Sequence, residues 1–143
     1  MTVTIKIKGI KELNSALKKY EKKMKLLQPT SFYKDSVIVM KKDVLEHFRD
    51  ERGSDRKWKK SKRARREGGK TLQDKGLMRS SISSSTDRTS ASVGTNKTSK
   101  GVSYPRIHNE GLGGMPKREF LWLSKNAGKK IMDLMINELD KVR

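Results

Sequence analysis

The sequence predicts an α+β fold in which a small antiparallel sheet packs against helices that cover one of its faces. Three observations support this prediction. Apolar residues alternate at the start of the chain, they recur every three or four residues in three later stretches, and a serine-rich stretch has the pattern of a β-hairpin. The 143 residues contain no internal repeat, and this length suits one folding unit. We therefore expect a single domain that spans residues 1–143.

The first two predicted elements lie within the first 28 residues. Val3, Ile5 and Ile7 alternate with polar residues, which predicts a strand with one buried face that ends at Gly9. The next apolar residues have the spacing of an amphipathic helix, and they are Ile10, Leu13, Leu17, Tyr20, Met24 and Leu27. We expect this helix to end at Pro29.

A second amphipathic helix is predicted directly after Pro29, with Thr30 or Ser31 as its N-cap. Its apolar face consists of Tyr33, Val37, Met40, Val44 and Phe48. His47 falls at the polar border of this face. We expect the helix to end near Arg52–Gly53.

Positive charge is concentrated in the segment that follows, Gly53–Lys70. The chain carries a net charge of +19, and residues 52–70 hold ten basic and two acidic residues, which gives +8. Trp58 is the only large apolar residue there, so little apolar surface is available to offset the entropy of ordering the chain. We therefore predict a flexible basic loop over residues 53–75.

The second half of the chain predicts a hairpin and a last helix. The apolar positions of the hairpin are Leu77 or Met78, Ile82, Ala91 and Val93, and its serines face solvent. Its polar turn is Thr86–Ser90, and residues 96–103 form another polar loop. The C-terminal helix has a broad apolar face made of Phe120, Leu123, Ala127, Ile131, Leu134, Met135, Leu139 and Val142.

The residues that could carry chemistry form no catalytic, cofactor-binding or metal-binding pattern. The chain has no cysteine, which excludes disulfides, thiolate catalysis and Cys-based zinc sites. Asn109 and Glu110 follow His108, but adjacent residues of a regular element point in different directions and so form no dyad. The glycines at 111–114 neither follow a strand nor precede a Lys-Ser or Lys-Thr pair. We predict that the protein is not an enzyme and that His108 is a hydrogen-bonded structural residue.

The stretch RKWKKSKRARR, Arg56–Arg66, is a candidate arm for binding a polyanion or a partner protein. An aromatic ring among cations is typical of single-strand binders, which stack a base on the ring while the cations hold phosphates. The candidate residues are Arg56, Lys57, Trp58, Lys59, Lys60, Lys62, Arg63, Arg65 and Arg66. The residues alone leave three alternatives, which are docking on an acidic protein surface, a small nucleic-acid-binding module, and a solvated loop whose charge is incidental. No apolar run is long enough to span a membrane, so we expect no membrane contact.

Several motifs follow one another in the second half of the chain. They are GSDRKW with Trp58, LQDKGLMRSSI from Leu72 to Ile82, SVGT, YPRIHNEG from Tyr104 to Gly111, and KREFL from Lys117 to Leu121. This order resembles the tailed-phage virion morphogenesis family, the tail completion and head–tail joining proteins. The sequence departs from the family pattern at Pro105 and Lys75.

The resemblance implies a non-enzymatic protein of the virion tail or neck that is assembled in the cytoplasm of the bacterial host. Its implied partners are the tail tube, the tail terminator, and the neck or portal-side connector, and it is expected to form a homo-oligomeric ring. The alternative partner is DNA, which the basic arm would contact non-specifically. The candidate interface and motif residues are Tyr104, Ile107, His108, Asn109, Gly111, Arg118, Phe120 and Leu121.

The physical properties of this block favour a scaffold over a reaction centre. Asn109 and Gly111 tolerate left-handed backbone, so we expect them to terminate a short helix. Arg118 would hold a rigid guanidinium beside the apolar Phe120 and Leu121, an arrangement that suits a subunit interface.

Overall fold

The computed structural model describes residues 29–141. Its elements, in chain order, are the helices α3 (Pro29–Asp50), α4 (Lys62–Glu67) and α5 (Leu77–Ser80), the strands β1 (Ser83–Thr86) and β2 (Ala91–Gly94), and the helices α6 (Tyr104–Glu110) and α7 (Lys125–Asp140). This order confirms the predicted α+β class. The predicted strand at residues 3–7 and the predicted helix at residues 10–27 lie outside the described residues.

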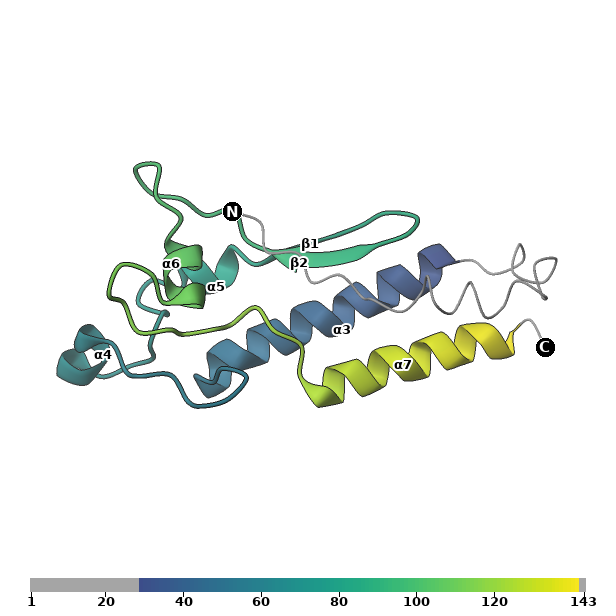
Figure 1. Ribbon diagram of the computed structural model, residues 1–143, viewed down its shortest axis with the longest axis horizontal. Coiled ribbons are helices and arrows are strands. Elements are labelled where there is room, and N and C mark those ends of the chain that lie inside the picture. The colour runs from purple at the N-terminus through teal and green to yellow at the C-terminus, as the bar shows by residue number, and fades with distance from the viewer. Residues whose placement is uncertain (1–28, 142–143) are drawn as a thin grey trace.

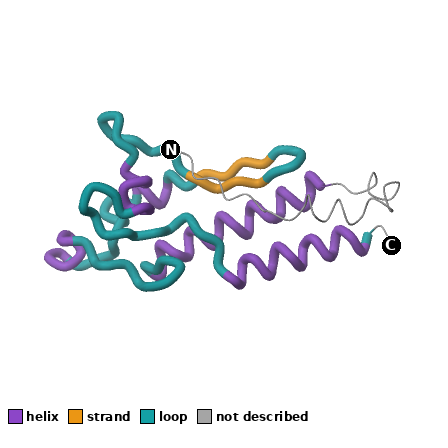
Figure 2. Tube along the Cα trace, viewed as in Figure 1, coloured by secondary structure: helices purple, strands orange, loops and turns teal. Residues whose placement is uncertain are grey.

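Three layers give the fold its shape. Figure 1 shows the β1–β2 hairpin along one side of α3, while α7 runs antiparallel to α3 along another. The short helices α4, α5 and α6 gather at the end where α3 terminates. Figure 2 shows that loops make up most of this end. We call it the loop end, and it contains all the motif residues of the stretch 104–121.

The central helix α3 confirms the predicted apolar face. The residues Tyr33, Val37, Met40, Val44 and Phe48 are all buried, and they form the middle of the core. The predicted N-cap at Thr30 or Ser31 is wrong, because the helix already begins at Pro29. Proline suits this first position, since its fixed φ is helical and its missing N–H would have no partner there.

The hairpin is confirmed, with Ser83 opposite Gly94 and Thr86 opposite Ala91 in an antiparallel register. Ala91 and Val93 are buried, whereas all four residues of β1 are exposed. A correction concerns Leu77 and Met78, which lie in the single turn of α5 and not in a strand. The hairpin therefore contributes one apolar face to the core, and α3 covers that face.

The C-terminal helix begins later than its apolar pattern predicts. Phe120 and Leu123 precede the helix in an extended segment, and α7 starts only after Ser124. The Ser124 hydroxyl accepts a hydrogen bond from Ala127 N at 3.2 Å, while Ser124 N donates to the Asp43 carboxylate of α3 at 2.8 Å. This cap and its anchor on α3 decide where the helix starts, and periodicity cannot show them.

The basic segment also requires a correction. The sequence predicted that its apolar content is too small to pack, yet the side chain of Trp58 is only 6% exposed and belongs to the core. Its ring meets the ring of Phe48 edge to face at a centroid distance of 5.6 Å. The prediction was wrong because the partners of Trp58 come from α3, outside the segment whose composition was weighed.

Two further hydrogen bonds attach this segment to the end of α3. Thr71 N donates to Glu51 Oε1 at 2.7 Å, and the Gln73 side-chain amide donates to Phe48 O at 2.6 Å. Between these attachments and Trp58, the short helix α4 is capped by the Ser61 hydroxyl. The cations of the segment are therefore carried on backbone that is fixed at both ends.

Candidate interaction site

An extended segment, Arg118–Leu121, lies at the centre of the loop end and belongs to no sheet. Buried backbone groups need hydrogen-bond partners, and here side chains supply them. Phe120 N and Leu121 N both donate to Asn109 Oδ1 at 3.0 Å. Phe120 O accepts a hydrogen bond from His47 Nδ1 at 2.9 Å. Two side chains therefore replace the ladder that a neighbouring strand would provide.

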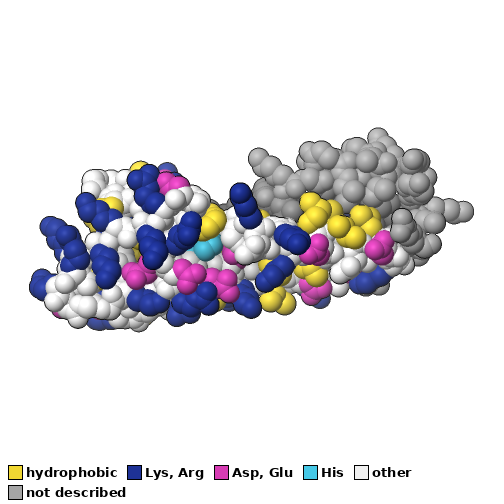
Figure 3. Space-filling model, turned by 90° about the horizontal axis from the view of Figure 1, so that it is seen from below, with side chains coloured by type: hydrophobic (Ala, Val, Ile, Leu, Met, Phe, Trp, Pro, Cys, Tyr) yellow, Lys and Arg dark blue, Asp and Glu magenta, His cyan; other side chains and the backbone are white. Residues whose placement is uncertain are grey.

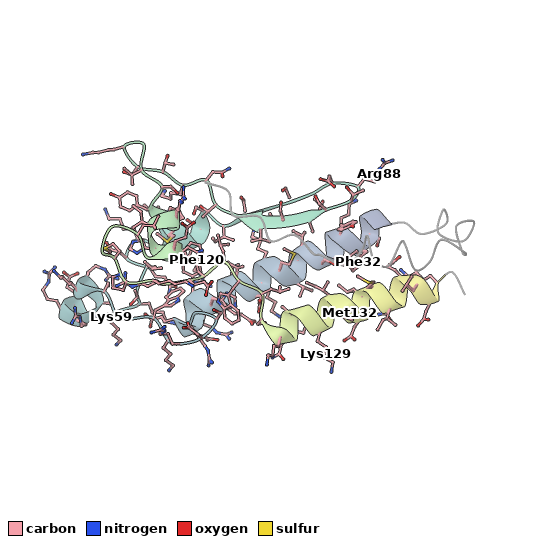
Figure 4. The ribbon with its side chains drawn as sticks, viewed as in Figure 1. Phe32, Lys59, Arg88, Phe120, Lys129 and Met132 are labelled. Carbon is pink, nitrogen blue, oxygen red and sulfur yellow. The ribbon has the colours of Figure 1, made fainter. Side chains whose placement is uncertain are left out.

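The basic segment holds the same stretch from another direction. The indole Nε1 of Trp58 donates to Glu119 O at 2.9 Å. The Glu119 carboxylate in turn accepts a hydrogen bond from the Ser54 hydroxyl at 2.5 Å. Figure 4 shows Phe120 inside the loop end and Lys59 on the segment that carries Trp58. The motif block and the basic segment thus form one hydrogen-bonded unit.

Arg118 is buried within this unit, with 3% of its surface exposed. Its backbone N donates to His108 O at 2.7 Å, and its Nε donates to Lys59 O at 2.8 Å. A terminal guanidinium nitrogen lies 3.3 Å from His108 Nδ1. The expectation that this guanidinium stands at a subunit interface is therefore wrong, because its partners lie within its own chain.

The short helix α6 positions Asn109 and ends at Gly111. Gly111 has a φ of 74°, and a Cβ there would lie 2.9 Å from the Lys117 Cβ, so both backbone and space require glycine. This confirms Gly111 as the helix terminator. Asn109, by contrast, lies inside the helix, and its function is carried by its side chain and not by a left-handed backbone.

His108 accepts a hydrogen bond in its neutral form. Burial lowers the pKa of His108 below its ordinary value, and the charge of Arg118 lowers it further. Burial also lowers the pKa of the Arg118 guanidinium. Because Arg118 can only donate, His108 Nδ1 must carry the lone pair in their contact. This arrangement supports the prediction of a structural histidine.

We expect this contact to make stability depend on pH. The unfolded chain protonates His108 near pH 6.5, whereas the folded chain does so only at lower pH. The His108 contribution is therefore complete above about pH 6.5 and is lost as the pH falls below it. His108→Asn keeps an acceptor for Arg118 and removes the titration. Thermal melts between about pH 7.5 and pH 5 should show a flatter dependence for this variant, and an unchanged slope would contradict the assignment.

His47 is the residue of this unit that the sequence analysis misplaced. It is buried rather than at a polar border, and its ring stacks on Trp122 with a centroid distance of 4.1 Å. Its Nε2 lies 3.5 Å from the Asp43 carboxylate one turn earlier. The spacing of four residues between Asp43 and His47 could have indicated that their side chains are neighbours on the helix. Periodicity could not show that Phe120 and Trp122, more than 70 residues later in the chain, contact His47.

The arm residues divide into two groups. Arg63 donates to Lys70 O at 2.8 Å and lies 3.6 Å from Asp74, whereas Arg56 and Arg66 pair with their acidic neighbours. Within residues 29–141, the other cations of the arm have exposed side chains and no ion pair, and they are Lys57, Lys59, Lys60, Lys62 and Arg65. Figure 3 shows Lys and Arg side chains spread over the loop end.

The remaining motif residues are not brought into the hydrogen-bonded unit. Ile107 is half-buried, and Tyr104 is 47% exposed at the start of α6. Three other exposed apolar side chains lie close to it in sequence, and they are Val102, Leu112 and Met115. The candidate site thus consists of an internal support, made by the motif residues, and an outer surface of cations and apolar side chains.

Fold and site together define a small basic α+β protein whose motif residues support its own backbone while many of its cations face solvent. The model of the phage virion morphogenesis family matches residues 45–140, more than half of the 143-residue chain. The chain belongs to this family, which confirms the resemblance. Membership gives the protein a role in the assembly of bacteriophage virions. No match was found among curated proteins or among solved structures.

Two negative findings apply to the part of the chain that the structure describes. Between residues 29 and 141, no three His, Asp or Glu side chains are grouped so that they could hold a metal ion. None of the helices in the same range is long and apolar enough to cross a membrane.

Proposed function

We propose that the protein is a non-enzymatic assembly protein that acts in tail completion or head–tail joining. It binds neighbouring virion proteins in the tail or neck, such as the tail tube, the tail terminator, or the neck or portal-side connector, and it forms a ring. In this proposal it is assembled in the host cytoplasm and stays in the virion. Family membership supports the assembly role. The observation that carries binding as its mode of action is the set of unpaired cations on a segment anchored by Trp58.

An acidic protein surface is the partner that suits these cations best. The segment is attached at Trp58, Thr71 and Gln73, so less conformational entropy is lost on binding than for a free arm. Complementary charge accelerates the encounter and disfavours wrong partners. Exposed charges also make the contact sensitive to salt, because the screening length is about 8 Å at physiological ionic strength.

Charge reversal of the arm tests this proposal. Changing Lys57, Lys59, Lys60 and Lys62 to Glu should weaken binding to the partner by at least about tenfold, a loss of about 1.4 kcal/mol, and should lower the titre of a phage that depends on the variant. The matched control reverses four other exposed cations, Lys75, Arg88, Lys97 and Lys100, and should keep the titre. Electron microscopy should show unjoined heads and tails for the arm variant only. Equal titres for the two variants would contradict the proposal.

The nucleic-acid alternative loses its most specific support. It required the ring of Trp58 to stack on a base, but this ring is buried and its N–H is bonded to Glu119 O. The exposed lysines can still contact phosphates without sequence preference. A salt titration of DNA binding by the arm variant and its control measures this contribution. Tight binding at physiological salt that only the arm variant loses would favour the nucleic-acid function.

A further inference from the structure

A groove of about 430 Å³ lies beside α3, α5 and β1, away from the loop end's hydrogen-bonded unit. It is lined by Ile38, Lys41, Lys42, Leu45, Glu46, Arg49, Arg79 and Ser84. Six of these residues belong to α3, and their spacing of three and four places them on one face of the helix. That face differs from the buried face formed by residues such as Met40 and Val44. We call this feature the α3 groove.

The α3 groove combines exposed apolar surface with positive charge. Ile38 is 65% exposed, an unusual position for a large aliphatic side chain, and Leu45, two turns further along the same face, is half-buried. Four cations and one carboxylate line the groove. Lys41, Lys42 and Arg79 form no ion pair with any residue of the described range. A fitting occupant therefore offers apolar side chains flanked by acidic groups.

The outer face of α7 has this composition. Met132 and Ile136 are 54% and 47% exposed, and their spacing of four places them on one face of the helix. Asp133 and Asp140 are exposed on the same side of α7. Figure 4 labels Lys129 and Met132 on α7. We call Met132, Asp133, Ile136 and Asp140 the α7 strip.

The local charge of the α7 strip is exceptional in this chain. Residues 131–140 contain three acidic residues and no basic one, although the protein has 35 lysines and arginines. No other stretch of ten residues shares this property. A second copy of the chain thus carries the acidic, apolar surface that the groove requires.

We propose that the α7 strip of one copy docks in the α3 groove of the next copy. Met132 and Ile136 would cover Ile38 and Leu45, while the aspartates of the strip face the cations of the rim, as in other helix-in-groove contacts. The two surfaces differ, so the contact is heterologous, and such contacts form a ring when the rotation between copies closes. The place of this contact in the virion rests on the proposed function. There it would be the interface between neighbouring subunits of the ring.

Cysteine cross-linking tests the contact directly, because the natural chain contains no cysteine. Ile38→Cys protein is mixed in turn with Met132→Cys and Ile136→Cys protein under mild oxidation. A disulfide needs Cβ atoms about 3.5 to 4.5 Å apart, so a covalent pair reports direct apposition. Ile38→Cys mixed with Arg88→Cys, at the exposed hairpin turn, is the control. We expect cross-linked pairs with at least one of the strip variants and none with the control.

A charge exchange tests the electrostatic part of the contact. The groove variant is Lys41→Glu with Arg79→Glu, and the strip variant is Asp133→Lys with Asp140→Lys. We expect sedimentation to detect oligomers of the natural protein, and each variant alone should lose them, since like charges then meet at the contact. An equimolar mixture should regain them, because each kind of groove then finds a strip of opposite charge. Thermal melts of each variant verify that it is folded.

Several results would overturn the proposal. They are cross-linking no stronger than the control, a natural protein that stays monomeric at all soluble concentrations, and a mixture that does not regain oligomers. If the strip packs against residues of its own chain, the strip variant melts earlier and mixing rescues nothing. If an acidic segment of another protein fills the groove, the groove variant lowers phage titre while sedimentation stays unchanged. A phage that remains fully infectious without the gene would refute the proposed function but not the contact.

Discussion

Trp58→Ala is expected to lower the free energy of unfolding by about 3 to 5 kcal/mol, the usual cost of truncating a buried large aromatic side chain. The ring is 6% exposed and meets Phe48 edge to face. Its loss would open a cavity at the end of α3 and leave Glu119 O without its donor. Urea unfolding of the purified protein measures the effect, and no partner is needed for it.

Trp58→Phe separates the two contributions. Phenylalanine retains much of the packing against Phe48 but cannot donate to Glu119 O, so we expect a loss of about 1 to 2 kcal/mol. Both variants should also release the basic segment, which proteolysis with trypsin would detect as faster cleavage around residues 56–66. A Trp58→Ala protein with the urea midpoint of the natural chain would mean that the indole does not support the core. In that case the ring would again be a candidate for stacking on a base, as the sequence alone allowed.

This role of Trp58 cannot be predicted from the composition of the basic segment alone. One tryptophan among ten cations cannot order a segment alone. In the structure, Trp58 packs on Phe48 and bonds to a carbonyl 61 residues later in the chain. Arg118 was misjudged for the same reason, since its acceptor on Lys59 comes from the segment that was expected to be free. Contacts with residues that are distant in the sequence determine the structural roles of both Trp58 and Arg118.

The sequence predicts well those elements that depend on residues close together in the chain. The apolar face of α3 follows from residue spacing, the hairpin from alternation around a polar turn, and the end of α6 from the backbone freedom of Gly111. The start of α7 was predicted too early, because Phe120 and Leu123 continue its apolar pattern while lying in extended chain. Asp43 and Ser124, which fix that start, are 81 residues apart.

Asn109→Ala is expected to destabilise the protein by about 2 to 6 kcal/mol, because it leaves two buried donors without an acceptor and each costs about 1 to 3 kcal/mol. The side chain of Asn109 accepts from Phe120 N and Leu121 N together, and both of these residues are buried. No strand lies beside this segment to take over the two bonds among the described residues. The substitution should not destabilise the helix α6 itself, since alanine has a higher helix propensity than asparagine.

Asn137→Ala, on the exposed surface of α7, is the matched control. It brings the same gain in helix propensity without touching a buried donor, so the difference between the two variants isolates the hydrogen bonds of Asn109. Amide exchange gives the residue-level readout. In the Asn109 variant, the amide protons of Phe120 and Leu121 should exchange much faster than those in the middle of α3, because their protection comes from one side-chain oxygen. Unchanged protection at these two amides would show that the Asn109 carbonyl is not what holds the motif block in place.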